Sequence, residues 1–339
     1  MTSQVNKQVV VDRQNQRRNW GIFARKNGLQ IGILGVMLLL WLFFLVLAPT
    51  TFGQFNIYAA FMSTVPFFGI VALPMTMLVI AREMDLSFPS IMAISVTAFV
   101  GVNQATGNVV LAFLACILTG FLVGLLNGLI VVYIGLPSLI ATIGTQFFWR
   151  GMVQVLTNGR SFSLIDLRGT PFRDLMVGRI AGAVPMQMIW MILVAVLIWI
   201  LLNRHQFGAH IYLIGDNDNS ARLMGINVNR TRVLAFAIVG VASAFAGLLT
   251  SLEVNNFFTN LGEGYLLIGL AAVFLGGTSV FGGVGTIFGT FIGCFIIASI
   301  QPAVVAIGWS GFTTQVIYGF IIVLSVAMHT MLRSRMRIS

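Results

Sequence analysis

The sequence is poor in charged residues. Only 8% of its 339 residues are Asp, Glu, Lys or Arg, whereas 58% are hydrophobic and the mean hydropathy is +0.96. Soluble domains carry about 25% charged residues, so this chain cannot cover the surface of a soluble fold of its size. A helix that crosses a bilayer needs about 20 apolar residues. The composition therefore predicts an all-α polytopic membrane protein with about ten transmembrane helices.

Residue types that carry catalysis or bind metals are scarce as well. The only lysines, Lys7 and Lys26, do not follow a glycine-rich loop of the kind that holds nucleotide phosphates. Three histidines, with no His-x-x-x-His pair, offer neither a zinc site nor a catalytic triad. Cys116 and Cys294 lie within apolar runs and are expected to be buried hydrophobes rather than a disulfide. We therefore expect no enzymatic activity, no metal and no cofactor in this chain.

Ten apolar runs are candidates for the transmembrane helices. In the second run, Pro66 and Pro74 remove backbone donors and are expected to kink or break the helix. The third run is short, which suggests a broken helix at the adjacent Pro89. The runs cover residues 30–48, 58–80, 89–100, 109–133, 137–156, 186–202, 233–251, 265–281, 285–300 and 312–329.

The basic residues are placed unevenly along the chain. Most of the 19 lysines and arginines fall in the tail 1–29, the loop 203–232 and the tail 331–339. Ten spans within a transmembrane domain of residues 30–330 place these segments on one side, and an excess of basic residues marks the cytoplasmic side. The loop 157–185, which contains Arg160, Arg168, Arg173 and Arg179, is expected on the outside as an exception. Nucleic acid is not an expected partner, because no soluble domain is present to bind it.

Two glycine stripes recur at a spacing of four residues. Such stripes let helix backbones approach closely in a membrane. They predict tight packing within one subunit, or else an interface between subunits. The stripes are Gly120, Gly124 and Gly128, and Gly285, Gly289 and Gly293.

The first motif is REMDLSFPS, residues 82–90. Ionisable residues beside apolar sequence are costly near membrane depth and are functional candidates by default. The motif therefore predicts a transport pathway beside a broken helix. Alternatively, it is a short loop in which Asp85 caps the next helix. The candidate pathway residues are Glu83, Asp85, Ser87 and Pro89.

The second motif is GDNDNSARLMGINVNR, residues 215–230. Residues 216–220 offer helix N-caps, residues 221–224 favour helix, and a glycine supplies the stop. The motif predicts a short amphipathic helix, which is unstable alone and so packs on the membrane domain or docks on a partner protein. The candidate docking residues are Asp216, Asp218, Ala221, Arg222, Leu223 and Gly225.

The third motif spans residues 263–293 and is dense in glycine. Glycine-rich turns adopt backbone conformations that are closed to other residues. The motif predicts either a hinge or tight packing between two spans. Its candidate residues are Gly276, Gly277, Gly282, Gly283 and Gly285.

Together the three motifs resemble the permease subunits of bacterial ABC importers for monosaccharides, the ribose/xylose/arabinose/galactoside permease family. That family commonly reads G-G-I-D-L-S-V-G-S at the first motif, G-G-N-E-x-A-A-R-L-S-G-I-N-V at the second and G-Y-E-L-x-A-I-A-A-V-x-L-G-G-T-S-x-x-G-G-x-G at the third. The matching residues include Asp85, Leu86, Ser87, Ala221, Arg222, Leu223, Gly264, Tyr265, Gly276, Gly277, Gly282, Gly283 and Gly285. Arg82 and Glu83 depart from the family, because they stand where paired glycines are usual.

The resemblance implies a type II importer permease in the bacterial inner membrane, with a coupling helix at residues 216–225 and both termini in the cytoplasm. It implies a separate ABC ATPase subunit that binds ATP and magnesium, an extracytoplasmic solute-binding protein, and a second permease copy or paralogue. The candidate contacts to the binding protein are Asp166, Asp174, Glu253 and Glu263. The alternative is a self-contained secondary transporter or channel, which would be expected to have ionisable coupling residues within its spans.

Overall fold

The structure is a computed structural model that describes residues 30–338, with side chains to Leu324. Every one of the ten apolar runs contains a helix. Seven described helices are long and apolar enough to cross a bilayer: Gln30–Leu47, α3 (Phe55–Ile80), α4 (Phe88–Thr106), α5 with η1 (Val109–Ile134), α8 (Met186–Asn203), α11 (Val228–Glu253) and α13 (Ile287–Ala306). The remaining three are α6 (Ser138–Thr157), α12 (Tyr265–Leu275) and α14 (Thr313–Ile338). The all-α polytopic prediction is confirmed.

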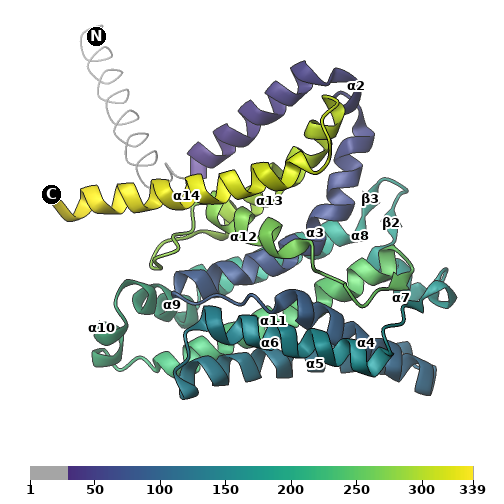
Figure 1. Ribbon diagram of the computed structural model, residues 1–339, viewed down its shortest axis with the longest axis horizontal. Coiled ribbons are helices and arrows are strands. Elements are labelled where there is room, and N and C mark those ends of the chain that lie inside the picture. The colour runs from purple at the N-terminus through teal and green to yellow at the C-terminus, as the bar shows by residue number, and fades with distance from the viewer. Residues whose placement is uncertain (1–29, 339) are drawn as a thin grey trace, which may run out of the picture.

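The helices pack into one bundle around α3 and α11. Helices α4, α5, α6 and α11 lie together along one side, and α3 and α8 lie beside them (Figure 1). Helices α12 and α13 also pack against α3, and α14 packs against α12 and α13. Within α3, 94% of the apolar window is buried, so this helix forms the centre of the protein.

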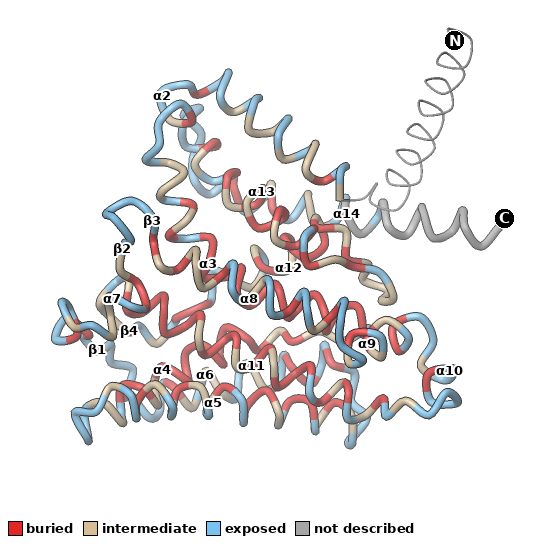
Figure 2. Tube along the Cα trace, turned by 180° about the vertical axis from the view of Figure 1, so that it is seen from behind, coloured by how far each residue is buried: buried red, intermediate tan, exposed pale blue. Residues whose placement is uncertain are grey.

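The two polar stretches lie at opposite ends of the bundle (Figures 1 and 2). One end carries α9 (Gln206–Asp216) and α10 (Asp218–Leu223), and we refer to it as the α10 end. The other carries α7 (Pro171–Val177), η2 (Ile165–Leu167) and two short antiparallel strand pairs, and we refer to it as the α7 end. The pairs are β1 (Phe162–Ser163) with β4 (Asn256–Phe257), and β2 (Arg179–Ile180) with β3 (Val184–Pro185). The C-terminal part of α14 extends toward the α10 end (Figure 1).

Several helix boundaries differ from the sequence-based expectation. Helix α3 continues through Pro66 and Pro74, which bend it without ending it (Figure 1). Helix α4 is 19 residues long and begins directly before Pro89, at a position where proline needs no hydrogen-bond partner for its nitrogen. The third span is therefore longer than expected and is not interrupted at Pro89; the non-helical residues are 81–87, directly before α4. The predicted run 265–281 is helical only to Leu275, and residues 276–286 form a turn. A short helix α2 (Pro49–Phe52) precedes α3.

Both glycine stripes pack within the chain, which confirms the first of the two interpretations. A Cβ atom on Gly240 of α11 would lie 2.2 Å from the Gly120 carbonyl oxygen of α5. A Cβ atom on Gly289 of α13 would lie 2.0 Å from the Gly276 carbonyl oxygen that follows α12. Both distances are far below van der Waals contact, so these helix pairs touch backbone to backbone.

The predicted basic tail 1–29 lies outside the described residues, and the side chains of Arg333, Arg335 and Arg337 are not described. Figure 1 draws the first of these segments as a thin trace.

Candidate functional site

The three sequence motifs meet at the α10 end. The Gly283 amide donates a hydrogen bond of 2.9 Å to the Ile80 carbonyl at the end of α3. The Tyr212 hydroxyl of α9 donates one of 2.8 Å to the Gly285 carbonyl. Segments that are 73 residues apart in the sequence or more thus share one junction, which we define as residues 80–87, 212–218 and 282–285.

Glycine is required at the centre of this junction. A Cβ atom on Gly215 would lie 1.9 Å from the Ile80 carbonyl oxygen and 2.5 Å from the Gly283 nitrogen. Gly282 and Gly283 adopt φ angles of 79° and 75°, the left-handed region that side chains disfavour. These glycines therefore bring three backbones into direct contact. Gly276 packs in the same way against α13, and Gly277 is also left-handed.

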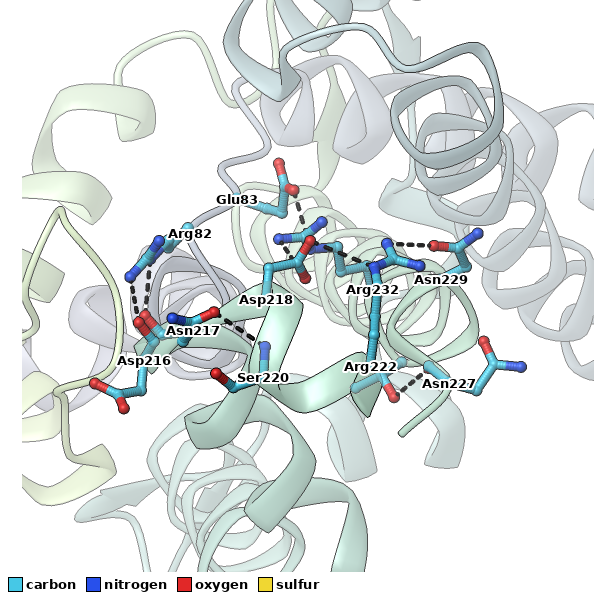
Figure 3. A network of polar contacts seen from close by, with 12 residues as sticks. Arg82, Glu83, Asp216, Asn217, Asp218, Ser220, Arg222, Asn227, Asn229 and Arg232 are labelled. Atoms are coloured by element: carbon cyan, nitrogen blue, oxygen red, sulfur yellow. Dashed lines mark hydrogen bonds and ion pairs between the residues drawn. The ribbon is translucent and has the colours of Figure 1, made fainter. Parts of the chain in front are cut away.

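Arg82 ties the loop after α3 to the end of α9 (Figure 3). Its Nε atom donates to the Gly215 carbonyl at 2.8 Å, and its second guanidinium nitrogen donates to the Asp216 carbonyl at 2.6 Å. Carbonyl groups at a helix C-terminus lack partners within the helix and carry partial negative charge, so a guanidinium is a suitable partner there. Arg82 has a φ angle of 65°, an unusual conformation for a side-chain-bearing residue.

A chain of ion pairs joins the same loop to α10 and α11 (Figure 3). Arg232 of α11 lies 3.2 Å from the Glu83 carboxylate and 3.4 Å from the Asp218 carboxylate. Asp218 also lies 3.6 Å from Arg222, one helical turn along α10. Burial raises the pKa of the Glu83 carboxyl, while the hydrogen bond with Ser138 and the Arg232 charge lower it. Arg232 thus provides a further link between the first motif and the second, in addition to the hydrogen bonds of Arg82.

Helix α10 is short and sharply delimited. The Asn217 side chain caps its start by accepting a hydrogen bond of 3.0 Å from the Ser220 amide. Gly225, with a φ angle of 81°, ends it. Ala221 is buried, whereas Leu223 is 90% exposed and Met224 is 58% exposed. The helix therefore presents an apolar tip to its surroundings at the α10 end.

Asp85 is fully buried and lies in a polar cluster. Its Oδ1 atom accepts hydrogen bonds from the Ser87 amide at 2.8 Å and the Ser87 hydroxyl at 2.6 Å. Its Oδ2 atom accepts one of 3.3 Å from the side chain of Asn127 in α5. The α3–α4 loop also donates from Met84 to Ser138, at 3.2 Å. Asp85 thus holds the loop against α5 directly before α4 starts, but the N-cap residue of α4 is Ser87 and no side chain caps the helix.

The four candidate acidic contacts do not form one group. Asp166 and Asp174 are exposed at the α7 end, on η2 and α7. Glu253 at the end of α11 accepts a hydrogen bond of 2.7 Å from Gln187. Glu263 lies apart from these residues, 3.7 Å from Arg150 of α6.

The junction includes residues that sequence reasoning did not single out. Arg232 entered only as part of the basic loop, although it contacts two carboxylates. Asn127 is a polar residue within the apolar run 109–133, and Ser138 lies at the start of the run 137–156, which were the only signals available for them. Among the described residues, no cluster of three or more His, Cys, Asp or Glu side chains could hold a metal ion.

Comparison with known proteins identifies the family. Residues 57–326 match the family described as "Branched-chain amino acid transport system / permease component". The ribose import permease RbsC of Bacillus subtilis is 33% identical over 259 residues, which cover 76% of this chain and 80% of that protein. The autoinducer 2 import system permease LsrD of Yersinia enterocolitica is 30% identical over 262 residues, 76% of this chain and 78% of that protein. No solved structure matches the chain. The chain therefore belongs to this family of permease components of import systems.

Proposed function

We propose that this chain is the transmembrane permease subunit of an ATP-driven ABC importer for a monosaccharide or a similar small polar solute. Membership of the permease family and the two kinds of relative, which import ribose and autoinducer 2, support this function. A separate ATPase subunit binds ATP and magnesium, since the sequence has no glycine-rich phosphate-binding loop with a following lysine.

The observation that carries the proposal is the apolar tip of α10. Leu223 is 90% exposed at an end of the bundle that also holds arginines and carboxylates, outside the apolar helical region. An exposed leucine beside an exposed methionine suits a protein partner better than water. The groove of an ATPase subunit is the partner that the family resemblance implies. The α10 end is then cytoplasmic, and so are the chain termini.

In the proposed import cycle, alternating access depends on the contacts that hold α10. When the partner ATPases bind ATP and close, they move α10. The Arg82 hydrogen bonds and the Arg232 ion pairs pass that movement to the α3–α4 loop. The cavity between two permease chains then switches sides. The α7 end, with Asp166 and Asp174, receives the extracytoplasmic binding protein.

The test is a pair of matched substitutions of exposed leucines. Leu223→Glu places a charge on the α10 tip, and Leu175→Glu places one on α7, where Leu175 is 53% exposed. We expect Leu223→Glu to abolish co-purification of the ATPase and ATP-dependent uptake while membrane insertion is retained. Leu175→Glu should leave ATPase binding unchanged.

Two results would contradict the proposal. The first is normal ATPase binding and uptake by Leu223→Glu, which would show that α10 is not the docking element. The second is solute uptake by vesicles that contain this chain without an ATPase or a binding protein, which would show a self-contained transporter.

A further inference from the structure

The segment before α12 enters the interior of the bundle without forming a helix. Strand β4 pairs with β1 at the α7 end, and the chain then runs through residues 258–264 to the start of α12. Helix α12 has 11 residues and a length of about 16 Å, roughly half of what a bilayer core requires. Figure 2 shows α12 between β4 at one end and α10 at the other.

Packing against α4 fixes the depth of this segment. The second half of α4 lies beside α7, because Phe99 stacks on Phe172 with ring centroids 6.3 Å apart. Gly262 instead packs against the first turn of α4, where an added Cβ atom would lie 2.9 Å from the Pro89 Cα and 3.0 Å from the Met92 sulfur. The ten helical residues between Pro89 and Phe99 correspond to about 15 Å. Gly262 therefore lies well inside the membrane-spanning part of the bundle.

Arg150 of α6 holds the segment in place. One of its guanidinium nitrogens donates to the Thr259 carbonyl, and another donates to the Leu261 carbonyl at 2.9 Å. Its Nε atom lies 3.7 Å from the Glu263 carboxylate. The Arg150 side chain is 12% exposed, whereas that of Glu263 is 56% exposed. The carboxylate thus projects from the surface of this chain at membrane depth, and Asn260 is exposed beside it.

Lipid is an unsuitable neighbour for this surface. Non-helical backbone and ionised side chains at membrane depth occur where they are buried in protein or line a water-filled cavity. Glu263 is not buried in its own chain, so the space that it faces holds either water or another subunit. The charges of Arg150 and Glu263 cancel, and the Asn260 amide both donates and accepts hydrogen bonds.

We propose that residues 258–264, with Glu263 and Asn260 exposed, line the solute pathway between this chain and a second permease chain. The cancelled charges and hydrogen-bonding groups suit a neutral polyhydroxylated solute, whose hydroxyls donate to the Glu263 carboxylate. This assignment rests on the proposed import function, but water access to the segment is measurable without transport.

The experiment uses thiol labelling of single-cysteine substitutions in the full-length chain in membranes. Cys116 and Cys294 are fully buried, so their background reaction is small. Asn260→Cys is compared with Leu118→Cys, a position on α5 that is 55% exposed on an apolar face. The probes are membrane-impermeant methanethiosulfonates, one cationic and one anionic. Because the thiolate is the reacting species, a cysteine in water reacts and a cysteine in lipid does not.

We expect Asn260→Cys to react at least about tenfold faster than Leu118→Cys. We also expect Asn260→Cys to react with the cationic and the anionic probe at similar rates, after correction for the intrinsic reactivity of each probe. Adding Glu263→Gln to Asn260→Cys leaves the Arg150 charge unbalanced and should shift the ratio of rates toward the anionic probe by about threefold or more. Equal rates for Asn260→Cys and Leu118→Cys would overturn the pathway assignment. A strong preference for one probe without Glu263→Gln would overturn the neutral-solute assignment. Neither result depends on whether the importer function holds.

Discussion

Replacement of Arg82 tests how the junction at the α10 end is held together. In the family that the first motif resembles, glycines are usual where this chain has Arg82 and Glu83. Arg82 adopts the left-handed φ of 65° that glycine favours, and its side chain makes two hydrogen bonds to the end of α9. Arg82→Ala removes the hydrogen bonds and keeps the unfavourable backbone conformation. Arg82→Gly removes the same bonds and relieves the backbone.

The magnitudes follow from the exposure of the side chain. Arg82 is exposed, so each hydrogen bond to a carbonyl is worth about 0.5–1 kcal/mol, below the usual range for a charged donor. Losing both bonds costs about 1–2 kcal/mol in Arg82→Ala. Because glycine adopts the left-handed conformation without strain, Arg82→Gly regains about 1 kcal/mol of stability relative to Arg82→Ala. The net cost of Arg82→Gly is therefore about 0–1 kcal/mol. The equilibrium constant for local opening of the junction then differs by roughly a factor of five between the two variants.

Hydrogen–deuterium exchange of the peptide that covers residues 211–224 measures this local opening. We expect exchange to be about 5–30 times faster in Arg82→Ala than in the unmodified protein, and clearly slower in Arg82→Gly than in Arg82→Ala. Arg168→Ala, an exposed arginine at the α7 end, serves as the control and should leave this peptide unchanged. Unchanged exchange in Arg82→Ala, or faster exchange in Arg82→Gly than in Arg82→Ala, would refute the reasoning.

Three further predictions concern packing, the buried cluster and pH. Gly240→Ala should lower the melting temperature sharply, because the added Cβ would lie 2.2 Å from a backbone oxygen. Gly144 is a helical glycine whose added Cβ would meet nothing within 4 Å, so Gly144→Ala should be neutral or stabilising. Equal effects of the two substitutions would contradict the backbone contact. Asn127→Asp places a second carboxylate beside Asp85 and should reduce the yield of folded protein in size-exclusion chromatography. Adding Asp85→Asn to this variant should restore part of the yield. The absence of any rescue would argue against a direct contact between residues 85 and 127. Because the pKa of Glu83 is raised, the folded state binds the Glu83 proton more tightly than the unfolded chain does. The stability that this proton contributes falls as the pH rises through the raised pKa. Acidification from about pH 7 to about pH 5 should therefore raise the melting temperature of the unmodified protein relative to that of Glu83→Gln.

The sequence was sufficient to predict the helices that coincide with long apolar runs. It was less informative where the end of a helix does not coincide with the end of an apolar run, or where a helix forms in polar sequence. Residues 276–281 carry no charge and continue directly from an apolar segment, so the eighth run was extended to residue 281. The left-handed glycines, such as Gly277 and Gly282, instead end the helix at Leu275. Helix α9 lies within a polar stretch and has 11 residues, too few to raise a hydropathy average. It forms because it packs against α8, α11 and α3.

The residues of the junction were largely predictable as motifs, but their assembly was not. Each motif has a local signal, such as the glycine density of residues 276–285 or the capping residues of 216–220. Contacts such as Arg82 with Gly215 join positions 133 residues apart, and no local pattern encodes them. Arg232 shows the same limit, because a basic residue in a polar loop has the same sequence signal whether it is solvated or paired with Glu83 and Asp218.

The α3–α4 loop is the place where a displacement of α10 reaches the core of the bundle. Ile80, at one end of this loop, terminates α3, the most deeply buried spanning helix. At the other end, Asp85 accepts a hydrogen bond from Asn127 of α5, and the Leu86 amide donates a hydrogen bond of 3.1 Å to the Thr142 hydroxyl of α6. Because Asp218 of α10 and Glu83 of this loop share Arg232, a movement of α10 that keeps both ion pairs carries the loop with it. In the proposed importer, the loop that moves with α10 is therefore also the loop that positions α3, α5 and α6 relative to one another.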